Sequence, residues 1–429
     1  MNTATKLVGL AALATTIAVA AAGCSASPGG SGGPVATTAP PNSVDLRMTV
    51  WTSNEDQLAL FDSIAEEYKS DHPEIKSITF ESLPFADYNT TLTTQIAGGN
   101  SPDLAWMGDL SKDLIASDAL VPLTDTLTAT KGWDYDDLLG SVTAEFSVDD
   151  QLYAYPFSNS PFALYVNENL LAQAGQTLDT DDLTWDQVSA VGSAVNAATG
   201  KGGFVIRDFN YASWNTLATV WTGWGASAWN EDGTECTFDS DQMVDAFQFL
   251  HDAIYVDTSM PGPGTTADFF AGDSAFTIAQ VSRASLLDGS FEYSVYPLPE
   301  GPEGTYSVIG QAGVGVLESS AHVQEATDFL AFLTNPENAA KLAQFFPPPR
   351  ESLLTGEKLA EVNTKLTAEQ LQTVVVDQIS DAVTLPNHTS PAEIAQKAKT
   401  ALDAMWTPDA DIESVLSSVC TAIDPLLAK

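Results

Sequence analysis

The sequence has few cationic residues. Sixteen lysines and arginines stand against 57 aspartates and glutamates, which gives a formal net charge of -41. This charge repels phosphate backbones, which argues against nucleic-acid binding, and it favours a soluble monomer that associates weakly with itself. Only four residues are arginine, so few bidentate clamps exist for an anionic ligand. The composition therefore favours an uncharged ligand.

Catalytic and metal-binding patterns are also missing from the sequence. The only G-x-S-x-G match, at 29–33, lies in a Gly/Ser-rich stretch, the sequence contains no H-E-x-x-H and no pair of C-x-x-C motifs, and its four histidines lack a metal-ligand spacing. The acidic runs at 134–137 and 179–182 lack the glycine and terminal glutamate of an EF-hand loop. We therefore expect no enzyme, no metal and no cofactor. A glycoside hydrolase remains the alternative from another class, because its two carboxylates need no short motif.

The chain has enough apolar material for real hydrophobic cores. Of its 429 residues, 44% are hydrophobic and 9% are aromatic, so the acidic charge does not indicate disorder. At about 150 residues per domain, this length predicts two or three compact units.

Residues 1–23 are typical of an export signal. The apolar run at 7–20 is rich in small residues and too short for a comfortable membrane span. It ends in Ala21-Ala22-Gly23-Cys24, which resembles a bacterial lipobox and implies that Cys24 is lipidated; an ordinary secretory signal is the alternative. Residues 24–44 are rich in Gly, Ser, Pro and Thr, so we expect a flexible tether between the outer face of the cell membrane and a folded unit.

Two further cysteines, Cys236 and Cys420, remain once Cys24 is assigned to the lipid. An even pair in an exported protein suggests a disulfide, and two buried free thiols are the alternative.

Hydrophobic periodicity predicts an α/β fold. Strand-like runs at 44–51, 78–83 and 104–107 alternate with helical patterns at 57–69 and 88–96. This β-α-β-α order implies a mostly parallel sheet with helices on its faces. Further along the chain we expect helices at 185–198, 243–255, 324–333 and 337–345, strands at 276–279 and 293–296, and a largely helical C-terminal region.

Five sequence motifs between residues 46 and 402 have the order and spacing of motifs in one protein family. They are Gly98-Gly-Asn-Ser-Pro-Asp-Leu-Ala-Trp-Met, the run 155–171, Thr184-Trp-Asp, the run 270–278 and Tyr296-Pro-Leu-Pro. Together they resemble the extracellular solute-binding proteins of ABC sugar importers, the family that includes maltodextrin-binding proteins. The resemblance implies a type II, two-lobed periplasmic-binding-protein-like fold that closes on ligand about a hinge.

The resemblance also implies lobe boundaries and a ligand cleft between the lobes. The first lobe is expected at 45–159 plus 299–320 and the second at 160–298 plus 321–429. Cys236 and Cys420 then share the second lobe, as a disulfide between them requires. Hinge closure buries a ligand between two preformed faces with little change inside either.

Candidate ligand residues follow from the matching positions and from the number of tryptophans. They are Asn54, Glu55, Tyr88, Trp106, Asp109, Asn159, Ser160, Asn210, Trp214, Trp224, Ser282, Arg283 and Gln311. Sugars offer flat apolar faces edged with hydroxyls, so aromatic, carboxylate and amide side chains suit them. The alternatives are helix capping for Asn54 and Glu55, a core position for each tryptophan and a surface salt bridge for Arg283.

The implied partners are a sugar or oligosaccharide and the permease subunits of an ABC importer. The maltodextrin binders carry a carboxylate at the position of Asn159 and a stacking tryptophan at the position of Ser282, so their ligand is not assumed here. A compatible solute held by cation–π contacts is the second ligand class.

Overall fold

The computed structural model describes residues 39–206 and 214–428. Its strands are β1 (Val44–Val50), β2 (Ile75–Ser82), β3 (Leu104–Met107), β4 (Ser147–Val148), β5 (Gln151–Leu152), β6 (Ala154–Asn167), β7 (Gly202–Ile206), β8 (Ser274–Gln280), β9 (Tyr293–Tyr296), β10 (Val308–Val316) and β11 (Val383–Thr384). Its first nine α-helices are α1 (Glu55–Asp71), α2 (Tyr88–Ala97), α3 (Ser111–Ala116), α4 (Thr124–Ala129), α5 (Gly140–Thr143), α6 (Glu168–Ala174), α7 (Trp185–Thr199), α8 (Ala218–Trp221) and α9 (Asp241–Tyr255). The later ones are α10 (Val323–Leu333), α11 (Pro336–Leu342), α12 (Gly356–Val362), α13 (Ala368–Leu371), α14 (Asp377–Ile379), α15 (Pro391–Leu402) and α16 (Ile412–Leu427).

The predicted helices and strands are present, with small shifts at their ends. Helix α1 begins where Asn54 caps it and buries Phe61, Ile64 and Tyr68 on one stripe, as the periodicity indicated. Helix α11 ends at Leu342, three residues before the predicted end at Phe345. The C-terminal region is largely helical, and its residues Gln372–Val376 form one turn of π-helix.

The main sheet is mixed, and the prediction of a mostly parallel sheet was wrong. Its strands follow the order β2-β1-β3-β10-β6-β8-β7, with β11 paired to β10 and β9 paired to β6. Strands β1, β2 and β3 are parallel, but β10 is antiparallel to β3 and β6, and β6 is antiparallel to β8 and β9. The difference arises because β6 and β10 run between the two parts of the sheet in opposite directions.

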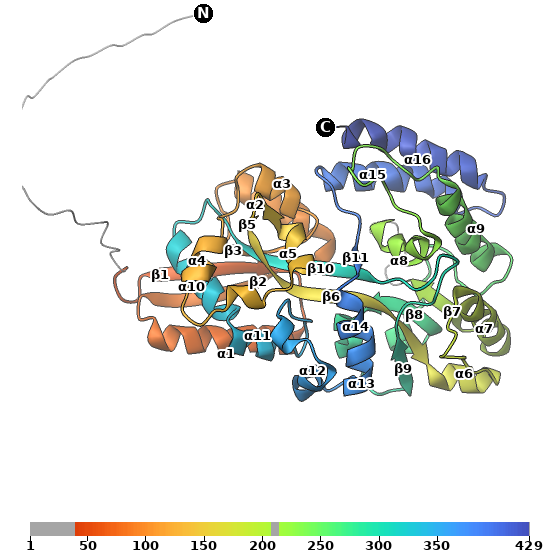
Figure 1. Ribbon diagram of the computed structural model, residues 1–429, viewed down its shortest axis with the longest axis horizontal. Helices are drawn as coiled ribbons and strands as arrows, with labels where there is room; N and C mark the ends of the chain where they lie inside the picture. The colour runs from red at the N-terminus through yellow and green to blue at the C-terminus, as the bar shows by residue number, and fades with distance from the viewer. Residues whose placement is uncertain (1–38, 207–213, 429) are drawn as a thin grey trace, which may run out of the picture. The chain divides into compact units, whose positions relative to one another are not determined.

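Strand β6 connects two groups of helices (Figure 1). Its first half, Ala154–Pro161, pairs with β10, and its second half, Phe162–Asn167, pairs with β8 and β9. In Figure 1, β6 and β10 run between a group that contains α1–α5 and a group that contains α6–α9, α15 and α16. The two strands are therefore the crossing segments between two lobes.

The two faces of β6 contribute to different cores in its second half. Phe162, Leu164 and Val166 pack into a core with α7, α9 and α16, whereas Ala163 and Tyr165 pack into a smaller core with α12 and α13. Successive side chains of a strand point to opposite faces, which explains the alternation.

Two segments contact a different lobe from the one that the sequence assigned. In the 323–346 stretch, the rings of Phe329 and Phe332 lie 5.3 and 5.2 Å from Tyr68 of α1. Near the other boundary, the Tyr306 hydroxyl donates to the Thr219 carbonyl at 2.7 Å, within the second lobe. Helix α10 thus packs against α1, which belongs to the predicted first lobe.

Within the described residues, no helix is long and apolar enough to cross a membrane. The same residues contain no cluster of three or more His, Cys, Asp or Glu side chains placed to hold a metal ion.

Candidate functional site

The carboxyl ends of β1, β2 and β3 meet at the edge of the first lobe that faces the second. Strand β3 ends at Met107, opposite Gly313 of β10, and the earlier residues of β10 continue past that end to pair with β6. Ligands in α/β folds bind outside the carboxyl ends of the strands. Trp51, Phe85 and Asp109 follow these three strand ends, so this edge is the candidate site.

Trp51 is held as a partly exposed aromatic platform. Its ring meets those of Tyr88 and Trp106 edge-on, with centroids 5.0 and 4.9 Å away. Phe85 lies 6.0 Å away on the open side, and 63% of its surface is exposed. Phe85 and Trp51 together form a small aromatic surface, and the buried rings of Tyr88 and Trp106 behind Trp51 fix its orientation.

Asp109 supplies a carboxylate beside this platform. The preceding residue, Gly108, lies against Trp51, since a Cβ placed on it would come within 3.6 Å of the indole ring. Asp109 is exposed. Desolvation by the surrounding protein nevertheless raises the pKa of its carboxyl, and the Glu145 carboxylate adds to the rise.

A small polar pocket of about 120 Å³ lies between the lobes near the same strand ends. It is lined by Asp56, Gln344 and Phe345 on the first-lobe side and by Val281, Ser282, Ala284, Ser285, Asn363, Thr364 and Lys365 on the second-lobe side. Hydroxyl, amide and carboxylate groups around one aromatic ring can donate and accept hydrogen bonds with a polyhydroxyl ligand.

Of the candidates after β1, Asn54 acts as a helix cap. Its side-chain oxygen accepts from the backbone N–H groups of Asp56 at 2.9 Å and Gln57 at 3.1 Å, so the capping alternative holds for this residue. Glu55 is exposed in the first turn of α1. Both residues lie at the strand edge described above.

Tyr88 and Trp106 are buried behind the platform rather than exposed on it. The Tyr88 hydroxyl lies 3.1 Å from the Thr49 hydroxyl and donates to the Trp106 carbonyl at 2.9 Å. Burial raises the pKa of Tyr88, with those hydrogen bonds opposing the rise. Trp106 contacts Phe157 and Phe346 at ring distances of 4.7 and 5.9 Å, which makes it a core residue.

Asn159, Ser160 and Gln311 lie on the crossing strands and bond to protein groups. The Gln311 side-chain amide donates to the Asn159 side-chain oxygen at 2.8 Å, and the Asn159 amide donates to the Pro156 carbonyl at 2.7 Å. The Ser160 hydroxyl accepts from the Ser282 backbone N–H at 2.9 Å, which joins β6 to the end of β8. Asn159 and Ser160 are fully buried, so these residues stabilise the crossing between the lobes.

The second-lobe candidates have mixed surroundings. Trp214 is buried in the second-lobe core, and Trp224 is partly buried 4.9 Å from Phe249, so the core alternative holds for Trp214. Ser282 lines the interlobe pocket. Burial raises the pKa of Tyr165, and the charge of the Arg283 guanidinium opposes that rise. Asn210 and Cys24 lie outside the described residues.

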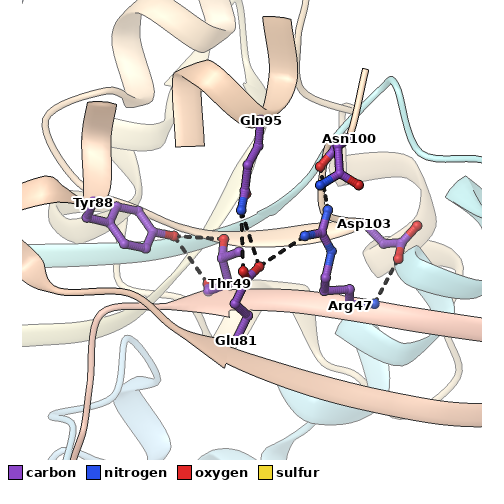
Figure 2. A network of polar contacts seen from close by, with 7 residues as sticks. All are labelled: Arg47, Thr49, Glu81, Tyr88, Gln95, Asn100 and Asp103. Carbon is purple, nitrogen blue, oxygen red and sulfur yellow. Dashed lines mark hydrogen bonds and ion pairs between the residues drawn. The ribbon is translucent and has the colours of Figure 1, made fainter. Parts of the chain in front are cut away.

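The Pro102-Asp103 motif has a structural role (Figure 2). The Asp103 carboxylate accepts from the Arg47 backbone N–H at 2.8 Å and from the Ser320 hydroxyl at 2.5 Å. Figure 2 shows that the Arg47 guanidinium reaches Glu81 at 3.1 Å on one side and the Asn100 carbonyl on the other. This network connects the strands of the first lobe. The motif is therefore a feature of the fold, and it carries no information about the ligand.

Sequence reasoning missed Trp51, Phe85 and the Asn363–Lys365 part of the pocket. Position was the available signal for the first two, because Trp51 is the last residue of the predicted strand 44–51 and Phe85 lies two residues after the predicted strand 78–83. The 363–365 loop follows α12 and is brought to the pocket by contacts distant in sequence, such as Tyr293 donating to the Lys365 carbonyl at 2.6 Å.

The fold and the site define a two-lobed solute-binding protein. The chain belongs to the bacterial extracellular solute-binding protein family, whose model matches residues 51–340. It is 24% identical over 323 residues to the arabinooligosaccharide-binding protein of Halalkalibacterium halodurans, covering 70% of each chain. It is 25% identical over 304 residues to the lactose-binding protein of Rhizobium radiobacter, covering 66% of this chain and 69% of the relative. Among solved structures, an ABC substrate-binding protein from Listeria monocytogenes in complex with cycloalternan superposes with a TM-score of 0.79 at 22% identity, over 90% of this chain and 100% of that one.

Replacing Asp109 by asparagine is expected to stabilise the folded protein at neutral pH. The folded-state pKa of this carboxyl is raised, so the native state binds more protons than the unfolded state, and stability falls as pH rises from the ordinary value of about 4 through the raised one. An amide removes that cost. Thermal melts of Asp109→Asn and the unchanged protein should differ at pH 7 and converge near pH 3. A lower melting temperature for the variant at pH 7 would contradict the expectation.

Proposed function

We propose that this protein captures a sugar or oligosaccharide between its two lobes and delivers it to the permease subunits of an ABC importer. The observation that carries the proposal is the platform of Trp51 and Phe85 beside the Asp109 carboxylate at the strand ends. An aromatic face and a hydroxyl acceptor side by side suit a pyranose or furanose ring. The sugar named for each relative, and the cycloalternan bound in the Listeria structure, support the same ligand class.

We assign direct ligand contact to the residues at the lobe edges and a supporting role to the buried ones. The contact group contains Trp51, Glu55, Phe85, Asp109, Ser282 and Arg283, with Asn54 and Asn210 kept as candidates. Tyr88, Trp106, Trp214, Asn159, Ser160 and Gln311 position these residues or the crossing strands. Trp224 is only partly buried and stays a candidate for contact.

Removing the Phe85 ring is expected to weaken sugar binding without unfolding the protein. Covering one phenyl ring with ligand is worth about 2 kcal/mol, which corresponds to roughly a 30-fold change in Kd. The ring is largely exposed before binding, so Phe85→Ala should leave the melting temperature of the free protein within about 1 °C, in line with surface substitutions generally. A thermal-shift screen of a sugar panel first identifies the sugar that stabilises the protein most. Isothermal titration calorimetry with that sugar then measures the Kd of the unchanged protein and of Phe85→Ala.

Val256→Ala is the matched control, because Val256 is 69% exposed at the end of α9, away from the strand edge. It should bind as the unchanged protein does. Equal Kd values for Phe85→Ala and the unchanged protein would remove the platform from the site.

We further propose that the protein is anchored to the outer face of the cell membrane through lipidated Cys24. The lipobox-like sequence and the Gly/Ser/Pro-rich tether that follows support this. Cys24→Ser should move the protein from the membrane fraction to the medium or periplasm. Retention of the variant in the membrane fraction would refute the anchor.

We also propose revised lobe boundaries. The first lobe takes 45–159, the second half of β10 and about 317–346, and the second lobe takes 160–307 and about 347–429. The Lys341 ammonium, 3.0 Å from the Glu67 carboxylate of α1, supports the change for α11.

A further inference from the structure

We infer that residues 385–390, between β11 and α15, form a latch that holds the two lobes in one relative position. This inference concerns the equilibrium between lobe arrangements, so it stands apart from the identity of the ligand. None of the residues that line the interlobe pocket belongs to this segment.

The 385–390 segment makes three hydrogen bonds to the first lobe, through Asn387 and Ser390. The Asn387 side-chain amide donates to the Glu145 carboxylate at 2.7 Å, and the Lys112 ammonium donates to the Asn387 backbone carbonyl at 3.0 Å. The backbone N–H of Ser390 donates to the Asp113 carboxylate at 2.8 Å. Lys112 and Asp113 belong to α3, and Glu145 to the short turn that precedes β4.

The same segment is fixed to the second lobe by Leu385 and His388. Leu385 and the following helix α15 pack into the second-lobe core. The His388 ring nitrogen Nε2 lies 3.0 Å from the Gly233 carbonyl, and the ring lies 5.5 Å from that of Trp229. The segment is therefore part of the second lobe, and its bonds to α3 and Glu145 cross between the lobes.

The second-lobe anchor is itself covalently restrained. Gly233 lies in the loop between Trp229 and Cys236, and Cys236 is bonded to Cys420 of α16. The Cys236 backbone N–H also donates to the Asp424 carboxylate at 2.8 Å. The disulfide thus holds the loop against which His388 packs.

The crossing bonds constrain lobe movement because hydrogen bonds tolerate only a few tenths of an ångström. A rotation of one lobe about β6 and β10 changes every distance between α3 and the 385–390 segment. The bonds can be complete in one arrangement only, so they bias the equilibrium toward that arrangement. Glu145 also helps to raise the pKa of Asp109, which links the latch electrostatically to the candidate site.

The test measures the distance between the lobes in the ligand-free protein. Genetically encoded spin labels replace Ser63 in the first lobe and Asp245 in the second, both exposed, and pulsed EPR gives the distance distribution. The double variant Asn387→Ala/Asp113→Ala removes two crossing bonds. We expect a broader distribution, with the ratio of arrangements shifted roughly tenfold by the loss of two partly buried hydrogen bonds.

The control pair removes equivalent bonds inside the second lobe. Asn196→Ala removes an amide bond to the Lys201 carbonyl at 3.0 Å, and Asp268→Ala removes a carboxylate that accepts from the Phe270 backbone N–H at 3.0 Å. This pair should leave the distribution unchanged. Asn387→Asp keeps the side-chain size but places a second carboxylate beside Glu145, so it should broaden the distribution without leaving a cavity.

Either an unchanged distribution in both latch variants or equal broadening in the control pair would overturn the latch. The double variant Cys236→Ser/Cys420→Ser tests the anchor, since a loosened loop should also broaden the distribution. If the distance distribution does not change when the disulfide is lost, the proposed role of the disulfide in holding the loop is wrong. The proposal about the crossing bonds would not be affected by that result. Because no ligand is added, these outcomes do not depend on whether the protein binds a sugar.

Discussion

Reduction of the Cys236–Cys420 disulfide is expected to lower the free energy of unfolding by about 5 kcal/mol. The two cysteines are 184 residues apart, and the chain-entropy model gives about that value for a loop of this length. The bond connects the C-terminal helix α16, whose buried face completes the second-lobe core, to the strand-like stretch before α9. Without the bond, α16 is held by its packing and by the hydrogen bond from the Cys236 backbone N–H to the Asp424 carboxylate.

Urea unfolding with and without a reducing agent measures the difference as a shift in midpoint at constant slope. The Cys236→Ser/Cys420→Ser variant should match the reduced protein and should not respond to the reducing agent. Two reactive thiols in the unfolded, unreduced protein would show that the bond is absent. A change below about 1 kcal/mol would mean that the unfolded chain is already restrained or that the native bond is strained.

Replacing Arg350 by methionine is expected to destabilise the protein by about 3–5 kcal/mol, the usual cost of breaking a buried charged network. Arg350 is fully buried. Its guanidinium donates to the carbonyls of Asp134 at 3.0 Å and Thr334 at 2.9 Å, and it lies 4.4 Å from the Trp133 ring centroid. Methionine fills much of the volume but leaves both carbonyls without this donor and removes the cation–π contact.

Arg47→Met is the matched control for this prediction. Arg350 lies 3.5 Å from the Asp137 carboxylate, and Arg47 likewise lies 3.1 Å from the Glu81 carboxylate. The Arg47 side chain is 28% exposed, so the loss should be about 1 kcal/mol or less. Chemical denaturation of the two variants under the same conditions gives the comparison. Equal losses would show that burial does not govern the contribution of these arginines.

The sequence predicted local structure well because helix and strand periodicities are local properties. The stripe of Phe61, Ile64 and Tyr68 defined α1, and Asn54 caps that helix, which was one of the two alternatives for this residue. The direction of β6 and β10 is not local: it depends on how two distant strands pair, so the mixed sheet was missed. The ring contacts between α10 and Tyr68 of α1 also join segments that are distant in sequence, so periodicity did not indicate them.

The surroundings of the candidate site residues could not be predicted, because a position in a motif does not fix the direction of a side chain. Tyr88 and Trp106 occupy the expected region but point into the core, whereas Trp51 and Phe85 form the exposed platform. Arg350 illustrates the limit, since its partner Asp134 is 216 residues away in sequence. Such contacts become visible only when the chain is folded.

The most direct test of sugar binding is a thermal-shift screen of the folded unit, Pro40–Lys429. The panel contains mono- and oligosaccharides, betaines, amino acids and sugar phosphates. A ligand at about 100 times its Kd adds about 2.7 kcal/mol to stability, which raises the melting temperature by several degrees. We expect stabilisation by one class of neutral sugar or oligosaccharide. A response to betaines or phosphates with none to any sugar would contradict the carbohydrate assignment and leave a two-lobed binder of another solute.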